Sequence, residues 1–215
     1  MIIVKIIRAL WLFSFVESAL ASEEIGKLEE KLQFSYLSQL SFEELLDQKE
    51  LRSSCLNDLN QKKVTEESQK LGSLFKKEIE SGYSTKISIR WISEEVGYGA
   101  FSEENIEENA FVSEVVGVVR KGIRDVLNGY SVIYPVLDKE GSYFVIDGKN
   151  KGNMTRFINH SSSPNLRFFW AFDDGLYHGI LIANQKIRKG DQLSVDYGFI
   201  YWKAIGKVPV ELAEH

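Results

Sequence analysis

The sequence predicts a mostly β fold preceded by an N-terminal helical extension, and three observations support this fold class. All three prolines, Pro135, Pro164 and Pro209, lie in the later part of the chain, so the earlier part can form long helices. From Lys86 onward, apolar residues alternate with polar ones, and short apolar runs then follow one another. Closely spaced short strands are typical of small β-sheets, whereas the regular strand-helix alternation of a doubly wound nucleotide-binding fold is not found.

The N-terminal segment, residues 1–21, allows two interpretations. It carries Lys5 and Arg8 before an apolar run and ends in small residues, which is typical of a secretory signal peptide. Glu17 near the small residues and the short basic region favour instead an apolar helix that packs on the protein itself or on a second copy. The run is too short to span a bilayer comfortably. The sequence does not decide between the signal peptide and the packing helix.

Residues 22–85 are expected to form the helical extension. Ser41 and Glu44 have the spacing of a capping box, and Thr65, followed by two glutamates, is typical of another helix start. Apolar residues then recur at helical spacing as far as Gly82, a residue type that ends helices. The extension either covers one side of the following domain or serves homodimer formation or substrate docking, and the sequence leaves these roles open.

Residues 86–203 are expected to form the β domain, followed by a C-terminal tail over residues 204–215. Ile87, Ile89 and Trp91 alternate with polar residues, as in a half-buried strand. Further apolar runs are separated by turn signals rich in Asp, Gly and Lys, and we expect each run to be a strand. These runs cover residues 111–116, 143–146, 166–172, 180–183 and 193–195.

Composition excludes several kinds of site. The net charge of −5 argues against a protein that binds nucleic acid through phosphate contacts, which need a basic face. Cys55 is the one cysteine, so the chain can form neither an intrachain disulfide nor a structural zinc site with several thiolates. Only three histidines are present and His215 is the last residue, so we expect no metal site.

The first motif is Gly97-Tyr98-Gly99, directly after the first strand of the β domain. A Gly-x-Gly pair alone is often only a tight turn, and here it lacks the third glycine of a dinucleotide site and the Lys-Ser/Thr of a phosphate loop. Because glycine has no Cβ, such a pair also lets the backbone approach a ligand closely. The motif therefore indicates either a turn or a ligand contact.

The second motif is the polar stretch 152–165, which concentrates hydrogen-bonding side chains. It contains the run Arg156-Phe157-Ile158-Asn159-His160-Ser161, and about thirty residues later a strand ends on Asp196-Tyr197-Gly198. Ser161, His160 and Asp196 could be imagined as a hydrolase triad. No Gly-x-Ser-x-Gly elbow exists, however, and adjacent Ser and His side chains rarely point at each other.

Together these motifs resemble those of SET-domain protein-lysine methyltransferases, over roughly residues 86–203. The stretch 156–165 is similar to the SET motif almost residue for residue, with Ser162 where cysteine is common. The resemblance implies a SET fold, whose C-terminal pseudoknot brings residues 156–160 next to residues 194–198. Without that cysteine no zinc-held lid is expected, so a short segment around residues 201–202 would close the lysine channel instead.

The resemblance also implies a role for each site residue. The catalytic residue would be Tyr197, and the cofactor would be S-adenosyl-L-methionine. Val115 and Val195 stand where many relatives carry aromatic channel residues, so other aromatics are candidates for the channel wall and the degree of methylation stays open. The expected cofactor-binding residues are Gly97, Tyr98, Gly99, Arg156, Asn159 and His160, and the expected substrate-binding residues are Tyr130, Tyr134, Tyr201 and Trp202.

The expected partner is a basic protein, histone or histone-like. Seven glutamates lie between Glu94 and Glu114, and no Lys or Arg occurs from Trp91 to Val119, so part of this region could attract a Lys/Arg-rich segment. The alternative is a solvated acidic face without a binding role. A competing interpretation of the whole protein is a SET-fold module that binds a peptide or partner without turnover.

Residues 32–37, 96–99 and 201–203 look most like the SET proteins of chlamydiae and their relatives. This resemblance implies a bacterial protein that works in the bacterial cytoplasm or after secretion into a host cell, as an effector. If it acts on histones it would work in the host nucleus as a chromatin regulator.

Overall fold

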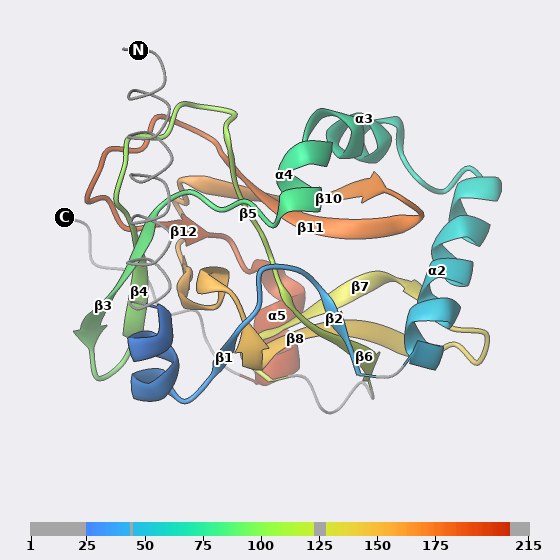
Figure 1. Ribbon diagram of the computed structural model, residues 1–215, viewed down its shortest axis with the longest axis horizontal. Coiled ribbons are helices and arrows are strands. Elements are labelled where there is room, and N and C mark those ends of the chain that lie inside the picture. Colours follow the sequence, from blue (N-terminus) through green and yellow to red (C-terminus); the bar gives the residue numbers. More distant parts are fainter. Residues whose placement is uncertain (1–24, 44, 123–127, 207–215) are drawn as a thin grey trace, which may run out of the picture. The chain divides into compact units, whose positions relative to one another are not determined.

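The computed structural model describes residues 25–43, 45–122 and 128–206 (Figure 1). The chain divides into two compact units at the boundary between Tyr36 and Leu37. In the first unit, residues 25–32 are helical and the short strand β1 (Ser35–Tyr36) follows. The segment 1–21 lies outside the described residues.

Three helices open the second unit: α2 (Leu45–Asn60), α3 (Glu66–Leu74) and α4 (Lys76–Ser81). The helix start predicted at Thr65 is confirmed, because its side chain accepts a hydrogen bond from the backbone N–H of Ser68 at 3.0 Å. The stop at Gly82 is confirmed as well, since this residue is left-handed with φ of 63°. None of the described helices is long and apolar enough to cross a membrane.

The capping box expected at Ser41 is wrong. Ser41–Phe42 forms strand β2, which pairs in parallel with β6 (Gly117–Gly122). The pairing with a distant strand overrides the local helix-start pattern, so α2 begins only at Leu45. Helices α2 to α4 lie in the same compact unit as the strands that follow them, and the division into a helical extension and a β domain at residue 85 stays a prediction.

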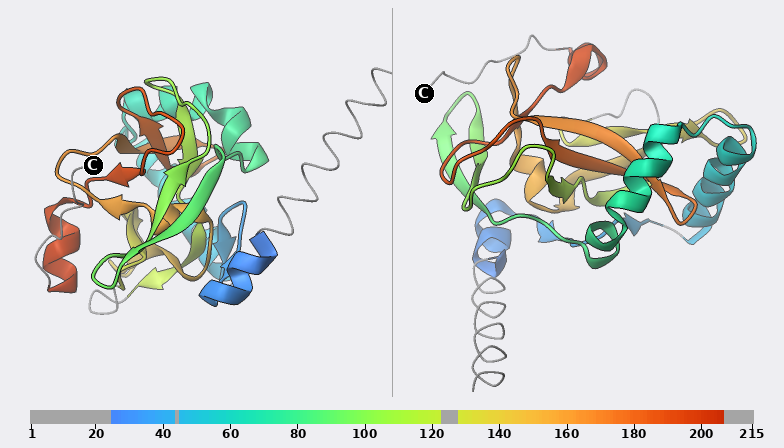
Figure 2. Two further views of the ribbon diagram at one scale, coloured as in Figure 1. Left: turned by 90° about the vertical axis from the view of Figure 1, so that its left-hand side faces the viewer. Right: turned by 90° about the horizontal axis from the view of Figure 1, so that it is seen from above.

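The remaining described residues of this unit are mostly strands, which confirms the predicted fold class. In one sheet, β8 pairs with β6 on one side and with β7 on the other, and a separate hairpin joins β3 and β4 (green in Figure 2). A second sheet has the order β5-β11-β10-β12-β9. The strands are β3 (Ile87–Ser93), β4 (Gly97–Ser102), β5 (Phe111–Glu114), β7 (Ser131–Leu137), β8 (Tyr143–Gly152), β9 (Asn159–His160), β10 (Leu166–Asp173), β11 (Leu176–Ala183) and β12 (Ser194–Val195).

The helices cover the two sheets through apolar contacts. Helix α2 buries Leu51 and Cys55 in the cluster that holds Tyr134 and Phe144, and burial raises the pKa of the Cys55 thiol to about 12, so it stays protonated. Helix α3 lies very close to β10, because a Cβ on Gly72 would fall within 2.5 Å of the Phe172 backbone. In Figure 1, β10 and β11 lie between α3 and the sheet that contains β7 and β8.

Short elements at the end of the chain bring the two motif stretches together. Strand β12 pairs in parallel with β9, with Ser194 opposite Asn159 and Val195 opposite His160. On its other edge β12 pairs with β10. The predicted juxtaposition of residues 156–160 and 194–198 is confirmed. Helix α5 (Gly198–Ile205) follows β12 directly.

Candidate active site

Tyr197 is held at both ends where β12 passes into α5. Its hydroxyl donates a hydrogen bond to the Ile158 carbonyl at 2.7 Å, and its backbone N–H donates to Nδ1 of His160 at 3.2 Å. Burial, and then the neighbouring phenols of Tyr201 and Tyr130, raise the pKa of Tyr197 well above its ordinary value. The side chain is therefore a neutral phenol in a fixed position, and not a base.

Tyr197 belongs to an aromatic cluster that joins α5 to β9. Its ring centroid lies 4.5 Å from that of Tyr201 and 5.8 Å from that of Trp202, and Trp202 lies 5.0 Å from His160. The Tyr201 hydroxyl donates to the Gly129 carbonyl at 3.2 Å. Through this bond, α5 is tied to the turn that precedes β7.

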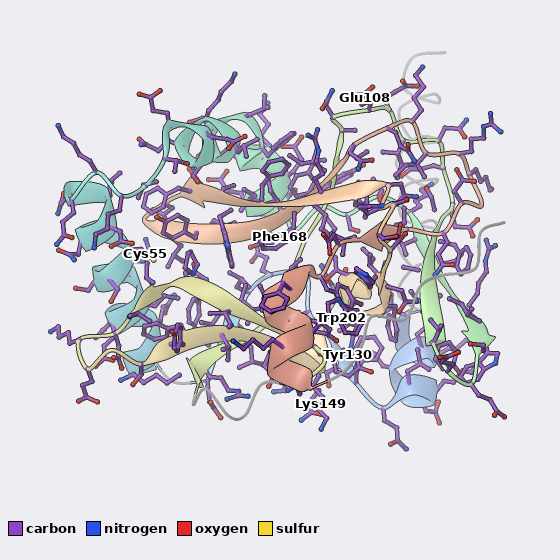
Figure 3. All side chains as sticks on the ribbon, turned by 180° about the vertical axis from the view of Figure 1, so that it is seen from behind. Cys55, Glu108, Tyr130, Lys149, Phe168 and Trp202 are labelled. Carbon is purple, nitrogen blue, oxygen red and sulfur yellow. The ribbon has the colours of Figure 1, made fainter. Side chains whose placement is uncertain are left out.

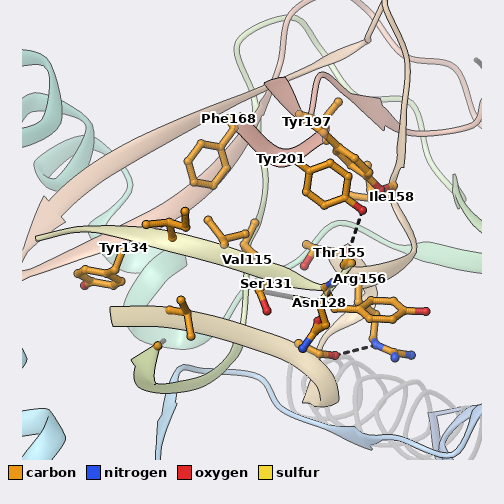
Figure 4. Close-up of a pocket in the computed structure, with 18 of the residues that line it drawn as sticks. Val115, Asn128, Ser131, Tyr134, Thr155, Arg156, Ile158, Phe168, Tyr197 and Tyr201 are labelled. Atoms are coloured by element: carbon orange, nitrogen blue, oxygen red, sulfur yellow. Dashed lines mark hydrogen bonds between the residues drawn. The ribbon is translucent and has the colours of Figure 1, made fainter. Parts of the chain in front are cut away.

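A cavity of about 1230 Å³ opens beside Tyr197 (Figure 4). Its wall near Tyr197 contains Tyr201, Val115 and Val195, together with Phe168 on β10. In the close-up, Tyr197 and Phe168 both lie along the side of the cavity opposite Ser131 on β7. Tyr197 thus presents a phenol to a part of the cavity whose wall is mostly apolar.

The predicted substrate-binding aromatics fall in different surroundings. Tyr201 and Tyr130 line the cavity, and the guanidinium of Arg156 lies 4.6 Å above the Tyr130 ring. Trp202, which is labelled on α5 in Figure 3, is not among the lining residues. Its ring packs on His160 instead. Tyr134 reaches the cavity, but its side chain is buried in the core and its hydroxyl donates to the Tyr177 carbonyl. We therefore leave Tyr134 out of the proposed channel.

The glycine motif and the polar stretch meet through one hydrogen bond. The side-chain amide of Asn159 donates to the Tyr98 carbonyl at 3.1 Å, which joins β9 to β4. Gly97 has φ of 80°, which side chains rarely allow, and no atom lies within 4 Å of the position of a Cβ. At Gly99 a Cβ would lie 2.4 Å from Cδ1 of Ile92. Gly97 is thus favoured by its backbone conformation and has open space beside it, whereas Gly99 is favoured by the close approach of the Ile92 and Gln192 side chains.

His160 and Arg156 are the remaining predicted cofactor-binding residues. His160 is buried at 7% exposure, and its Nδ1 lies 3.6 Å from a carboxylate oxygen of Asp196. The Arg156 guanidinium donates to the Gly148 carbonyl at 2.9 Å and to the Lys149 carbonyl at 2.7 Å, so these contacts hold the end of β8. The roles of both residues toward a cofactor stay predictions.

The hydrolase triad is not assembled. Nδ1 of His160 accepts from the Tyr197 backbone, whereas Oγ of Ser161 accepts from the backbone N–H of Ser163. Across the described residues, no three His, Cys, Asp or Glu side chains gather as a group that could hold a metal ion.

Sequence reasoning missed several groups that shape the site. The carbonyls of Ile158 and Gly129 act through the backbone, so no residue type signals them. Phe168 was visible only as part of an apolar strand. Glu114 and His178 form a buried pair with 2.7 Å between carboxylate oxygen and ring nitrogen, and a histidine far from any motif gave no signal of it.

The family comparison agrees with this geometry, since residues 97–198 match the model of the SET domain. The solved structure of ATXR5 in complex with histone H3.1 covers 80% of this chain and 85% of its own at a TM-score of 0.61 and 19% identity, which shows the fold alone. The chain therefore has a SET-domain fold.

Among curated proteins, the chain is 31% identical over 135 residues to the human histone-lysine N-methyltransferase EHMT1, covering 60% of this chain. It is 33% identical over 112 residues to the histone-lysine N-methyltransferase SUV39H2 of Xenopus tropicalis, covering 47% of this chain. It spans 10% and 27% of the length of these two relatives. Both relatives are named as histone-lysine N-methyltransferases, and the chain is similar to only a part of each.

Proposed function

We propose that this protein is an S-adenosyl-L-methionine-dependent methyltransferase that acts on lysine side chains of basic proteins, histone or histone-like. The observation that carries the proposal is the position of Tyr197: a neutral, fixed phenol at the wall of a largely apolar cavity, next to the glycine motif and the Asn159-His160 pair. The names of the relatives, which are histone-lysine N-methyltransferases, support the reaction class.

The described residues fit the proposed cofactor. The indole N–H of Trp202 and the side-chain amide nitrogen of Gln192 are both buried without a hydrogen-bond partner among the described residues. Trp202 packs on His160, and the Gln192 amide lies 2.9 Å from the position of a Cβ on Gly99. Two unpaired buried donors beside the two motifs suit a ligand rich in acceptors. Gly97, Gly99, Asn159, His160 and Trp202 would hold such a ligand.

S-adenosyl-L-methionine, when bound, would supply a methyl group on a positively charged sulfur. The lysine amine must lose its proton before it can accept that group. With a free pKa of ~10.4, deprotonation at neutral pH costs roughly 4–5 kcal/mol. Apolar walls such as Val115, Val195 and Phe168 disfavour the charged amine and so reduce this cost.

Tyr197 would orient the amine. Because its O–H donates to the Ile158 carbonyl, the lone pairs of the phenol oxygen are available to accept a hydrogen bond from a lysine N–H. Its raised pKa keeps it protonated throughout the physiological range, so the phenol positions the amine rather than removing its proton. Alignment of amine and methyl donor would then supply most of the acceleration.

The wider setting of the protein is also a proposal. Similarity of three short segments to the SET proteins of chlamydiae supports a bacterial origin and action on a histone or a histone-like protein, inside the bacterium or in a host cell. A homodimer formed through the helical extension, and binding without direct contact to nucleic acid, are further parts of this proposal.

A second candidate function is a SET-fold module that binds a lysine-containing segment without turnover. The binding module is favoured by Val115 and Val195, which line the cavity at positions where aromatic side chains would enclose the amine more closely. Such a module would bind cofactor and peptide but would leave the peptide unmodified.

The test is incubation of the pure protein with methyl-labelled cofactor and a panel of histones and bacterial basic proteins, with mass spectrometry of the products. The proposal predicts methyl-lysine in at least one protein. Cofactor binding measured by calorimetry together with no transfer to any member of the panel would favour the binding module instead.

A further inference from the structure

The cavity extends far beyond the position of Tyr197. Its lining includes β7 from Ser131, near the Tyr197 end, to Leu137, which pairs with Tyr143 on β8 at the far end. Six residue steps of a strand at ~3.3 Å each span roughly 20 Å. The volume of about 1230 Å³ also exceeds the roughly 1,000 Å³ upper end of pockets that hold drug-sized ligands. One lysine side chain would fill only a part of this cavity.

The far end of the cavity is apolar, and no described segment of the chain covers it fully. Leu137 is 45% exposed although it is a large hydrophobic residue, and Tyr143 lies opposite it. Ile133 and Pro135, on the same face of β7 as Leu137, continue this wall toward Tyr197. A bulky apolar side chain placed here would lose contact with water and would also shield these residues.

The charges that line the cavity do not favour a basic neighbour of the target lysine. Among the described lining residues, the charged ones are Arg156, Asp196 and Lys203. The ammonium of Lys203 lies 6.0 Å from the Phe199 ring, and no ion pair to it is found in the described part of the chain. Two cations against one carboxylate give the cavity lining a net positive charge, so a second Lys or Arg near the target would meet like charge.

The acidic run between Glu94 and Glu114 does not reverse this balance, because none of its glutamates lines the cavity. Glu103 pairs with Arg90 at 2.7 Å and Glu107 pairs with Lys186 at 3.0 Å. Glu114 is buried against His178. These three glutamates thus serve ion pairs and the core, and the run adds no carboxylate to the cavity lining beyond Asp196.

We propose that the far end of the cavity, lined by Ile133, Pro135, Leu137 and Tyr143, is a specificity subsite for a bulky apolar side chain that flanks the target lysine at a distance of a few residues. The inference rests on the proposed function and narrows its substrate class. The target would be a lysine with Leu, Ile, Met or Phe a few residues away and without Lys or Arg at the positions between them. A Lys/Arg-rich tail would be a poor substrate even within a basic protein.

The test uses two sets of peptides that share a central lysine and differ at its flanking positions, with Leu or Phe in one set and Lys or Arg in the other. Binding is measured by fluorescence anisotropy in the presence of S-adenosylhomocysteine, and transfer is measured with the labelled cofactor. The wild-type chain is compared with Leu137→Glu. The matched control is Leu74→Glu, at a leucine that is 62% exposed on α3 and does not line the cavity.

Burial of one bulky apolar side chain predicts a preference of about tenfold or more for the apolar set, both in binding and in kcat/KM. Leu137→Glu should reduce or reverse this preference because it adds a carboxylate to the apolar wall, while Leu74→Glu should keep it. Equal or better use of the Lys/Arg set by the wild type, or an unchanged preference in Leu137→Glu, would overturn the inference and leave the proposed function standing. Apolar preference in binding without any transfer would support the subsite and contradict the methyltransferase. If neither peptide set binds, the subsite is contradicted.

Discussion

The hydroxyl of Tyr201 ties α5 to the turn before β7, and its removal tests whether α5 closes the cavity. Tyr201→Phe keeps the ring that packs 4.5 Å from Tyr197 and deletes only the hydrogen bond to the Gly129 carbonyl. One such bond contributes about 0.5–1.5 kcal/mol. Its loss corresponds to a roughly 2- to 12-fold lower ratio of molecules with α5 closed to molecules with α5 open.

The expected result is a peptide KM raised by about that factor, with a smaller change in kcat, since Tyr197 keeps its own bonds to Ile158 and His160. The assay is steady-state transfer with varied peptide at saturating cofactor. The matched control is Tyr83→Phe, at a tyrosine that is 46% exposed and does not line the cavity. If Tyr201→Phe folds normally and its peptide KM equals that of the wild type, α5 does not act as the closing element.

Three further predictions concern the other parts of the site. Asn159→Ala removes the hydrogen bond to the Tyr98 carbonyl and should weaken cofactor binding by about tenfold, measured by calorimetry; unchanged affinity would contradict the role of this contact. Glu114→Ala leaves His178 without its partner and should lower the free energy of unfolding by about 2–4 kcal/mol, measured by urea titration. A loss below about 1 kcal/mol, as for a surface substitution, would contradict a stabilising role of this pair. Burial raises the pKa of the Tyr197 phenol in the folded state, so the contribution of the phenol to folding stability is present below pH ~10 and is lost as the pH rises further. The phenol therefore stays protonated well below pH ~10. In that range kcat should rise with pH as the lysine amine deprotonates, without a descending limb. A descending limb near neutral pH that titrates with the phenol would refute this assignment.

The parts of the fold that depend only on residues close together in the sequence could be predicted. The cap at Thr65 and the stop at Gly82 follow from local hydrogen bonding and from the conformational freedom of glycine. The strand from Ile87 follows from alternation of polar and apolar residues. The strand at Ser41 could not be predicted in this way, because its pairing with β6, which is distant in the sequence, outweighs a local pattern typical of a helix start.

The shape of the site could be predicted only in part. The motif residues of β4, β9 and β12 meet as expected, since the resemblance included their spatial relation. Strand β7 and helix α5 were not expected as elements, and they form much of the cavity wall. The cavity is lined by residues from strands far apart in the sequence, so neither its length nor its balance of charge could be inferred from any one stretch. The acidic run is the clearest example: it suggested a basic substrate, but its residues Glu103 and Glu107 are paired with cations away from the cavity.

The central claim is that Tyr197 positions a lysine amine for methyl transfer, and the most direct test is single-turnover transfer by Tyr197→Phe. This variant deletes the hydroxyl that donates to the Ile158 carbonyl and keeps the ring in its aromatic cluster. The account predicts a transfer rate reduced by about 100-fold, because a misplaced amine loses its alignment with the methyl donor. Cofactor affinity, measured on the same sample, should stay unchanged. A variant that binds cofactor normally and transfers methyl at the wild-type rate would contradict the account.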